Sequence, residues 1–286
     1  MSKPIIAIVG PTASGKTALG IEIAKRHSGE IICADSRTVY KGMDIGTAKP
    51  TAEERAEVPH HLLDVVTPDQ VFTASEFQNL ARDAISDIES RGKLAIIVGG
   101  TGLYVDAVLY DYNFPPENQK LRAEVKALSK TELQERAREL EIELNGSDFN
   151  NPLRLARAIE TVGQPKGKSA LRPQALVIGL DINRPELEKR IRARITQMLK
   201  AGFMAEVNEL LAKYGSDAPG LNGIGYRAFA KEQATKDAVE EFVRGDLNLA
   251  KRQMTWFKRN GDIHWVESPA EGLKLAEEFL SSRGIA

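Results

Sequence analysis

The sequence predicts an α/β fold in which a parallel sheet is flanked by helices. Four apolar runs, at residues 5–9, 30–34, 94–98 and 175–182, are typical of strands buried on both faces. Helical stretches separate these runs, and such alternation is the pattern of a parallel α/β sheet. A glycine-rich turn follows the first run directly, so the sheet is expected to carry a ligand at that edge.

The turn after the first strand has the form of a P-loop, G-x-x-x-x-G-K-T, which holds chains of phosphates. Its glycines let backbone N–H groups turn inward, Lys16 supplies positive charge, and the Thr17 hydroxyl can bind Mg²⁺. Residues 18–27 have helical spacing, so the phosphates would lie at a helix N-terminus. The sequence thus predicts a P-loop NTPase-like core. The predicted phosphate-binding residues are Gly10, Pro11, Thr12, Ala13, Ser14, Gly15, Lys16 and Thr17.

Later segments extend this core and interrupt it once. The spacing of Thr73 and Glu76 predicts a capping box, which would start the crossover helix before the third strand. A break at residues 113–116 precedes a charged helical stretch, after which a long helix at 185–202 and a short final strand at 263–267 are expected. We therefore expect a core of residues 1–113 and 151–286 and a small helical insertion of residues 114–150.

Composition excludes few functions. The net charge of −1 gives no overall attraction to polyanions, but residues 150–200 hold eleven Lys or Arg against four Asp or Glu. That excess fits either a polyanion-binding surface or solvated helix faces. Cys33 stands alone in a strand-like run, which predicts a buried thiol in a reducing compartment. Neither a signal peptide nor a membrane span is recognisable, so a cytoplasmic protein that does not bind membranes is expected.

Polar elements follow two further strands at the same predicted edge. Asp35 ends the second strand, where it could bind Mg²⁺, act as a general base or cap the next segment. A second glycine-rich turn, residues 99–102, follows the third strand and carries Thr101. On the long helix, Arg190 and Arg194 are one turn apart, so they could straddle a phosphate or simply lie on the surface.

Motifs along nearly the whole chain resemble those of the bacterial tRNA dimethylallyltransferases. P-loop kinases share only the first of them, so the combination is specific. After the P-loop, the matching segments are Asp35-Ser36-Arg37-Thr38-Val39-Tyr40, Gly46-Thr47-Ala48-Lys49-Pro50, Pro59-His60-His61-Leu62-Leu63-Asp64, Gly99-Gly100-Thr101-Gly102-Leu103-Tyr104, Arg154-Leu155-Ala156-Arg157, Gly223-Ile224-Gly225-Tyr226-Arg227 and Lys251-Arg252-Gln253-Met254-Thr255-Trp256-Phe257.

The resemblance implies transfer of a dimethylallyl group from its diphosphate to N6 of adenosine 37, beside the tRNA anticodon. The P-loop would hold the diphosphate, while Lys16, Arg194 and Thr17 with Mg²⁺ neutralise the leaving group. Asp35 would be the general base and Thr101 would place the target base. The tRNA anticodon stem-loop and dimethylallyl diphosphate are the expected partners of a monomeric enzyme. The tRNA contacts implied by the resemblance are Asp35, Ser36, Arg37, Thr38, Thr101, Arg122, Leu153, Arg154, Leu155, Ala156 and Arg157.

The chain departs from the family pattern at two positions and in one length. Thr38 and Leu153 stand where the family usually has glutamine, and the insertion is shorter than usual, so altered RNA recognition is expected. Three alternatives compete: an enzyme that prenylates free adenine nucleotides, a P-loop kinase that uses ATP, and a non-catalytic RNA-binding protein. The basic stretch and Arg122 argue against the first, the motifs after residue 35 against the second, and intact Lys16 and Asp35 against the third.

Overall fold

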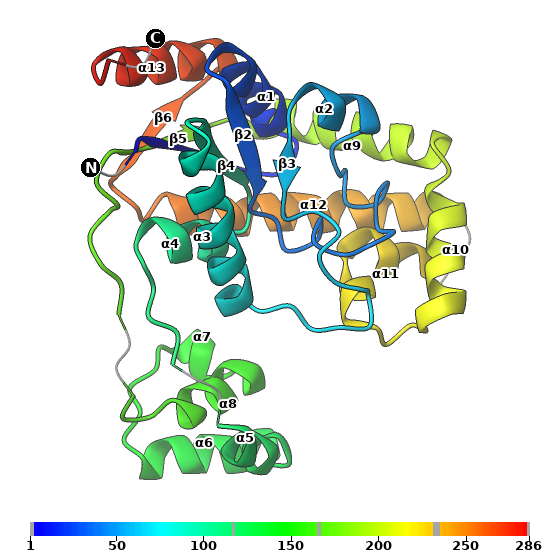
Figure 1. The fold of residues 1–286 in the computed structure, drawn as a ribbon. Helices are drawn as coiled ribbons and strands as arrows, with labels where there is room; N and C mark the ends of the chain where they lie inside the picture. The colour runs from blue at the N-terminus through cyan, green and yellow to red at the C-terminus, as the bar shows by residue number, and fades with distance from the viewer. Residues whose placement is uncertain (1–2, 116–117, 165–166, 231–234, 285–286) are drawn as a thin grey trace. The chain divides into compact units, whose positions relative to one another are not determined.

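The computed structural model describes residues 3–115, 118–164, 167–230 and 235–284. The chain forms two compact units, one of Met1–Asp111 with Ala170–Ala286 and one of Tyr112–Ser169. The first unit contains a sheet with helices on both sides, and the second contains helices only (Figure 1). The predicted α/β fold is confirmed in the first unit.

The sheet of the first unit has six strands in the order β3-β2-β4-β1-β5-β6, and every neighbouring pair is parallel. The four strands predicted from apolar runs and the final strand are all present within one or two residues. The two-residue strand β3 was not predicted, because so short a segment carries no periodicity. The strands are β1 (Ile5–Val9), β2 (Gly29–Cys33), β3 (His60–His61), β4 (Leu94–Gly99), β5 (Ala175–Leu180) and β6 (Ile263–Val266).

The register of the sheet brings three functional segments to one edge. Cys33 of β2 is paired with Val98 of β4, and Val98 is paired with Ile8 of β1. The P-loop, Asp35 and the turn after β4 therefore all begin at the carboxyl ends of adjacent parallel strands. Burial raises the pKa of the Cys33 thiol to about 12, so this residue is a packing residue as expected.

Helices cover both faces of the sheet. α1 (Lys16–Arg26) and α13 (Pro269–Ser281) pack on one face, and α3 (Ala74–Ser90) and α4 (Gly102–Leu109) on the other, as Figure 1 shows. Alternate strand residues supply the two faces of the core, as in any buried strand. The capping box at the start of α3 is confirmed, since Thr73 and Glu76 exchange backbone-to-side-chain hydrogen bonds of 2.7 and 3.2 Å.

All but one of the remaining helices of the first unit surround a second hydrophobic core, which contains Val39, Ile195, Phe203, Tyr226 and Phe242. None of the helices in the described part of the chain has the length and apolar character of a membrane span. The helices around this second core are α9 (Arg184–Lys200), α10 (Phe203–Tyr214), the 3₁₀ helix η1 (Pro219–Asn222), α11 (Ile224–Ala230) and α12 (Lys236–Phe257), whereas α2 (Ala52–Glu57) contacts α1.

The second unit is larger than the insertion of residues 114–150 that the sequence predicts. Its helices pack around a small core in which Leu155 and Ile159 are buried against Val125 and Leu133. Because those two residues belong to α8, that helix is part of the second unit and not of the α/β core. Helical periodicity shows that α8 has an apolar face, but it does not show which core that face joins. The helices are α5 (Gln119–Lys126), α6 (Lys130–Glu139), α7 (Gly146–Phe149) and α8 (Pro152–Glu160).

Candidate active site

The P-loop connects β1 to α1, and its shape depends on glycine. Gly10 has a φ of 144°, and a Cβ there would lie 2.8 Å from the Leu180 carbonyl oxygen. A side chain is therefore excluded both by conformation and by the approach of β5. Gly15 caps α1 in the left-handed region, so the helix N-terminus opens directly onto the loop. The loop conformation agrees with the phosphate site that the sequence predicts.

Lys16 lies against the inside of this loop. Its Nζ donates a hydrogen bond of 2.6 Å to the carbonyl oxygen of Pro11. Burial lowers the pKa of Lys16 to about 8, the charge of Asp35 raises it, and that of Arg194 lowers it further. With a pKa of about 8, the ammonium of Lys16 loses its proton at mildly alkaline pH, and an anion bound beside it would raise that pKa.

Arg194 supplies a second positive charge from α9. One of its terminal nitrogens donates to the carboxylate of Asp246 on α12 at 2.5 Å. Its Nε is buried without a hydrogen-bond partner among the residues that the structure describes. Arg190, one turn away, donates at 3.4 Å to the Ser14 carbonyl oxygen, so both arginines face the P-loop rather than solvent alone. A buried donor without an acceptor is costly, which favours an anionic ligand at this place.

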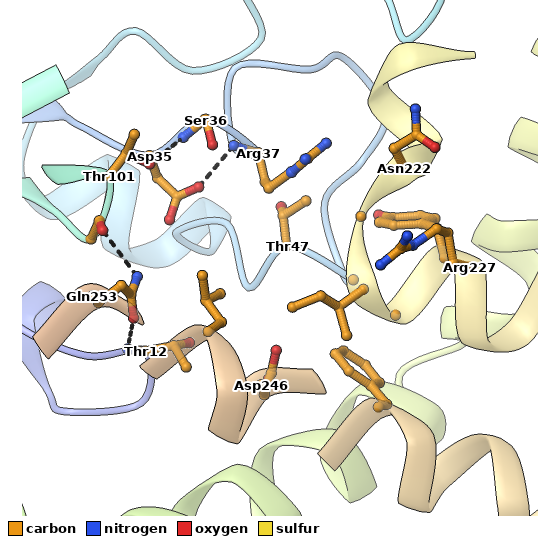
Figure 2. Close-up of a pocket in the computed structure, with 18 of the residues that line it drawn as sticks. Thr12, Asp35, Ser36, Arg37, Thr47, Thr101, Asn222, Arg227, Asp246 and Gln253 are labelled. Carbon is orange, nitrogen blue, oxygen red and sulfur yellow. Dashed lines mark hydrogen bonds between the residues drawn. The ribbon is translucent and has the colours of Figure 1, made fainter. Parts of the chain in front are cut away.

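Asp35 and Thr101 lie beside the P-loop and are held by backbone amides. The Arg37 amide donates to the Asp35 carboxylate at 2.8 Å, and the Ser36 amide donates to the Thr101 hydroxyl oxygen at 3.0 Å. A hydroxyl group can donate one hydrogen bond while its oxygen accepts another, so the Thr101 hydroxyl hydrogen remains for a ligand. Figure 2 shows the Asp35 carboxylate pointing into the pocket.

Gln253 on α12 links the donor and acceptor sides of this site, a role that the sequence did not predict. Its side-chain oxygen accepts from the Thr12 amide at 2.8 Å, and its nitrogen donates to the Gly100 carbonyl at 3.0 Å. One buried amide therefore joins the P-loop to the turn that carries Thr101 (Figure 2). The segment containing Gln253 matches one of the family motifs, but nothing in its spacing indicates which backbone groups Gln253 contacts.

Asp35, Thr101, Arg194 and Gln253 line one pocket with a volume of about 360 Å³, which Thr12 of the P-loop also lines but Lys16 does not. Its lining combines polar residues, among them Thr12, Asp35, Thr101 and Arg194, with a group of five apolar or aromatic side chains, the apolar side. Arg227 and Arg252 also line the pocket and add positive charge to that of Arg194. The sequence does not predict a site role for either residue. The apolar side comprises Met198, Ile224, Tyr226, Phe242 and Leu249.

Thr38 follows Asp35 but does not present its side chain to a ligand. It is buried, and its hydroxyl donates back to the Asp35 carbonyl oxygen at 3.4 Å. Ser36 and Arg37, by contrast, line the pocket, and Arg37 also donates to the Gly220 carbonyl at 3.3 Å. Of the predicted tRNA contacts in this segment, the Thr38 side chain is thus the one that the fold withdraws from the surface.

The other predicted RNA contacts lie in the second unit. Leu153 is 82% exposed, and the exposed Arg154 pairs with Asp148. Arg157 pairs with Glu160 at 3.1 Å. The side chain of Leu155 is fully buried and stabilises the unit rather than reaching a ligand. Ala156 and Arg122 are partly exposed.

The basic stretch of residues 150–200 does not form one surface of one unit. It begins in the second unit and ends on α9 of the first. Several of its arginines have carboxylate partners, among them Arg172 with Glu89 and Arg192 with Glu240. The local charge excess is therefore largely compensated by ion pairs, as the interpretation of solvated helix faces expected.

The residues at the P-loop can contribute to a magnesium site but cannot complete one. Within the described ranges no group of three or more His, Cys, Asp or Glu side chains is arranged to hold a metal. Thr17, at the start of α1, supplies a single hydroxyl oxygen. Mg²⁺ commonly retains water and is held partly by substrate phosphates, so this donor set fits an ion that binds together with a diphosphate.

Comparison with known proteins gives a consistent result. The family model described as IPP transferase matches residues 38–260. A tRNA dimethylallyltransferase of Exiguobacterium sibiricum is 43% identical, over 93% of this chain and 90% of its own length. The full-length tRNA isopentenylpyrophosphate transferase of Bacillus halodurans has 32% identity and a TM-score of 0.75, covering 99% of this chain and 98% of that one. A eukaryotic dimethylallyltransferase acting on tRNA shares the fold, with a TM-score of 0.83 at 23% identity, over 98% of this chain and 80% of that one.

Proposed function

The chain belongs to the IPP transferase family, and we propose that it transfers a dimethylallyl group from dimethylallyl diphosphate to N6 of adenosine 37 in tRNA. One observation carries the proposal. Thr12 of the P-loop, Arg194 and the Asp35–Thr101 pair line the same pocket as the apolar side. That arrangement offers a place for a diphosphate, a hydrocarbon tail and a polar acceptor together.

The donor diphosphate is assigned to the P-loop. The N-terminus of α1, Lys16 and Arg194 provide the positive electrostatic environment that a leaving diphosphate needs. The Arg194 Nε, buried without a protein acceptor among the described residues, gains one from a phosphate oxygen. The five-carbon tail then extends toward the apolar side of the pocket, which contains Tyr226 and Phe242.

The reaction joins N6 of the adenine to C1 of the prenyl group. The bond between C1 and the diphosphate oxygen breaks, and its electron pair leaves with the diphosphate. The adenine amino group is a weak nucleophile because its lone pair is delocalised, so removal of its proton by the Asp35 carboxylate assists the attack. The Thr101 hydroxyl donates to an acceptor atom of the base and holds it in register with Asp35.

Magnesium is part of the proposal. Thr17 would bind the ion together with diphosphate oxygens and water, and the ion would add positive charge against the leaving group when bound. The other steps need only residues of the chain, because Lys16 and Arg194 bind the phosphates and Asp35 accepts the proton.

The acceptor nucleotide must leave its stack to enter the pocket. A base in an anticodon loop is single-stranded, so extruding it costs little. Arg37, Arg227 and Arg252 line the pocket and can bind the flanking phosphates. Leu153 and Arg154 of the second unit are exposed and available to other parts of the RNA. A tRNA substrate supports a cytoplasmic site of action.

The direct test uses the purified protein, Mg²⁺, dimethylallyl diphosphate and an anticodon stem-loop with adenosine at positions 36 to 38. Nucleoside mass analysis should show the gain of one C₅H₈ unit on adenosine 37 alone. AMP is tested as an alternative acceptor of the prenyl group, and ATP is tested as a donor of phosphate. Prenylation of AMP but not RNA would instead identify a nucleotide prenyltransferase, and phosphate transfer from ATP would identify a kinase.

A further inference from the structure

A carboxylate outside the pocket fixes one of its walls. Glu206 on α10 accepts hydrogen bonds from three consecutive backbone amides, those of Asp44 at 2.9 Å, Ile45 at 2.7 Å and Gly46 at 2.9 Å. Hydrogen bonds to an ionised acceptor are about twice as strong as neutral ones. The loop of residues 44–47 is therefore held to α10 by a single side chain, and Glu206 itself does not line the pocket.

The same carboxylate holds a pocket aromatic residue. The Tyr226 hydroxyl donates to Glu206 at 2.6 Å, and the ring of Tyr226 is 2% exposed. Burial and the charge of Glu206 raise the pKa of Tyr226 well above its usual value, so the phenol remains a donor. Tyr226 lies on the apolar side of the pocket, which means that Glu206 positions two neighbouring parts of the wall.

Close packing makes the loop and the rings depend on one another. A Cβ at residue 46 would collide with the Phe203 ring and lie 2.7 Å from the Tyr226 ring. Phe203 meets Tyr226 edge to face at a centroid distance of 5.3 Å and also contacts the ring of Phe242. Gly46, Tyr226 and Phe242 all line the pocket. A shift of the loop at Gly46 would therefore displace the wall as a whole.

We propose that Glu206 is a positioning residue that sets the depth of the apolar side and so limits the length of the prenyl chain that is accepted. The inference rests on the proposed function, since it assigns the apolar side to the prenyl tail. The wall is held in place by four hydrogen bonds, and the tail must fit beside the reacting base edge in the pocket of about 360 Å³ that this wall borders. A ten-carbon tail needs the wall to retreat.

The test compares dimethylallyl diphosphate with its ten-carbon homologue, geranyl diphosphate, in the wild-type enzyme and in Glu206→Gln. Glutamine turns one acceptor oxygen into an NH₂ group that faces N–H or O–H donors. Each carboxylate oxygen accepts two of the four hydrogen bonds, so the substitution removes at least one charge-assisted bond, which corresponds to roughly a 10- to 100-fold effect. We therefore expect KM for dimethylallyl diphosphate to rise by about that factor, and the ratio of kcat/KM values to shift at least about tenfold toward geranyl diphosphate.

Glu209→Gln is the matched control, because Glu209 is exposed on the same helix and does not line this pocket. Tyr226→Phe removes only the hydroxyl group and should shift the ratio of kcat/KM values in the same direction by a smaller factor. This variant provides the test if Glu206→Gln fails to fold. The proposal is overturned if folded variants keep the wild-type ratio, or if kcat falls equally for both diphosphates. A wild-type enzyme that transfers neither prenyl group would refute the proposed function instead.

Discussion

Asp35 and Thr101 are both held by the backbone of one turn, the turn that follows β2. The turn after β2 donates its amides to both side chains, through Arg37 to Asp35 and through Ser36 to Thr101. Neither interaction requires a second side chain, so the orientation of both groups follows from the path of one turn. The proposed base and the proposed hydrogen-bond donor are thus held in place before a substrate enters.

Asp35→Asn should lower turnover by about 10²- to 10⁴-fold, the usual contribution of a general base. The asparagine side chain has the shape of the aspartate side chain, and its oxygen can still accept the hydrogen bond from the Arg37 backbone amide. The affinity for tRNA should therefore change little. Single-turnover kinetics and tRNA binding measured together separate the two effects. The exposed Asp217→Asn is the control for loss of one negative charge. Normal turnover with weakened tRNA binding would contradict the assigned role.

The lowered pKa of Lys16 predicts a decline in kcat/KM for dimethylallyl diphosphate at alkaline pH. With its pKa near 8 in the free enzyme, Lys16 is charged below that pH and becomes neutral above it. Diphosphate binding favours the charged form, so kcat should stay level where kcat/KM falls. Lys16→Arg, which keeps its charge, should abolish the decline even if its activity is lower. A wild-type kcat/KM that stays level to about pH 10 would exclude a lowered pKa.

At the scale of elements, α12 is the helix that joins the parts of the site. Gln253 links the P-loop to the turn after β4, Asp246 holds Arg194, and the Trp256 side chain donates to Asp106 of α4 at 2.8 Å. These residues come from one helix and reach four segments of the first unit, namely the P-loop, the turn after β4, α9 and α4. The position of α12 therefore determines how the diphosphate side and the acceptor side face each other.

Gln253→Leu should disturb the diphosphate side and the acceptor side of the site at once. Leucine has a similar size but leaves the Thr12 amide and the Gly100 carbonyl without partners, at a cost of about 1–3 kcal/mol for each buried group. We expect a lower free energy of unfolding and roughly a 10- to 100-fold loss in kcat/KM for dimethylallyl diphosphate. Thr255→Ala, on the exposed face of α12, should leave both quantities unchanged. Equal kcat/KM values for the two variants would remove Gln253 from the site.

At the scale of the whole molecule, the proposed chemistry and part of the proposed RNA-binding surface belong to different units. The first unit contains every residue that lines the pocket, from Thr12 to Gln253. The second has its own small core, around Leu155 and Leu133, and exposes Leu153 and Arg154. Because each unit has a separate core, damage to one core is expected to leave the other folded.

Leu155→Ala and Leu153→Ala test this division with the same substitution two residues apart. The first creates a cavity in the core of the second unit and should destabilise that unit by about 2–5 kcal/mol. The second trims an exposed side chain and should change stability by less than about 0.5 kcal/mol. Both should weaken tRNA binding, whereas affinity for dimethylallyl diphosphate should stay at the wild-type value. Calorimetry and ligand titration measure these quantities, and a loss of diphosphate affinity in Leu155→Ala would show that the units are not independent.

The sequence by itself determined the features that are local in the chain. A strand, a glycine-rich loop and a helix in succession define the P-loop, and alternating apolar runs define the sheet whose edge carries Asp35 and Thr101. Parallel strands end at one edge, so the shared location of these segments could be predicted before their contacts were known. The motif order also indicated the family that the comparisons confirm.

Only the tertiary structure decided which distant residues complete the site. Gln253 contacts Thr12 across 241 positions of sequence, and Glu206 holds a loop about 160 positions earlier. The same is true of α8, whose apolar face joins the second unit and not the first. Periodicity specifies that a helix has a buried face, but the partner of that face is chosen by packing among all elements at once. Hydrogen bonds such as those of Gln253 and Glu206 form only after that packing has brought the segments together.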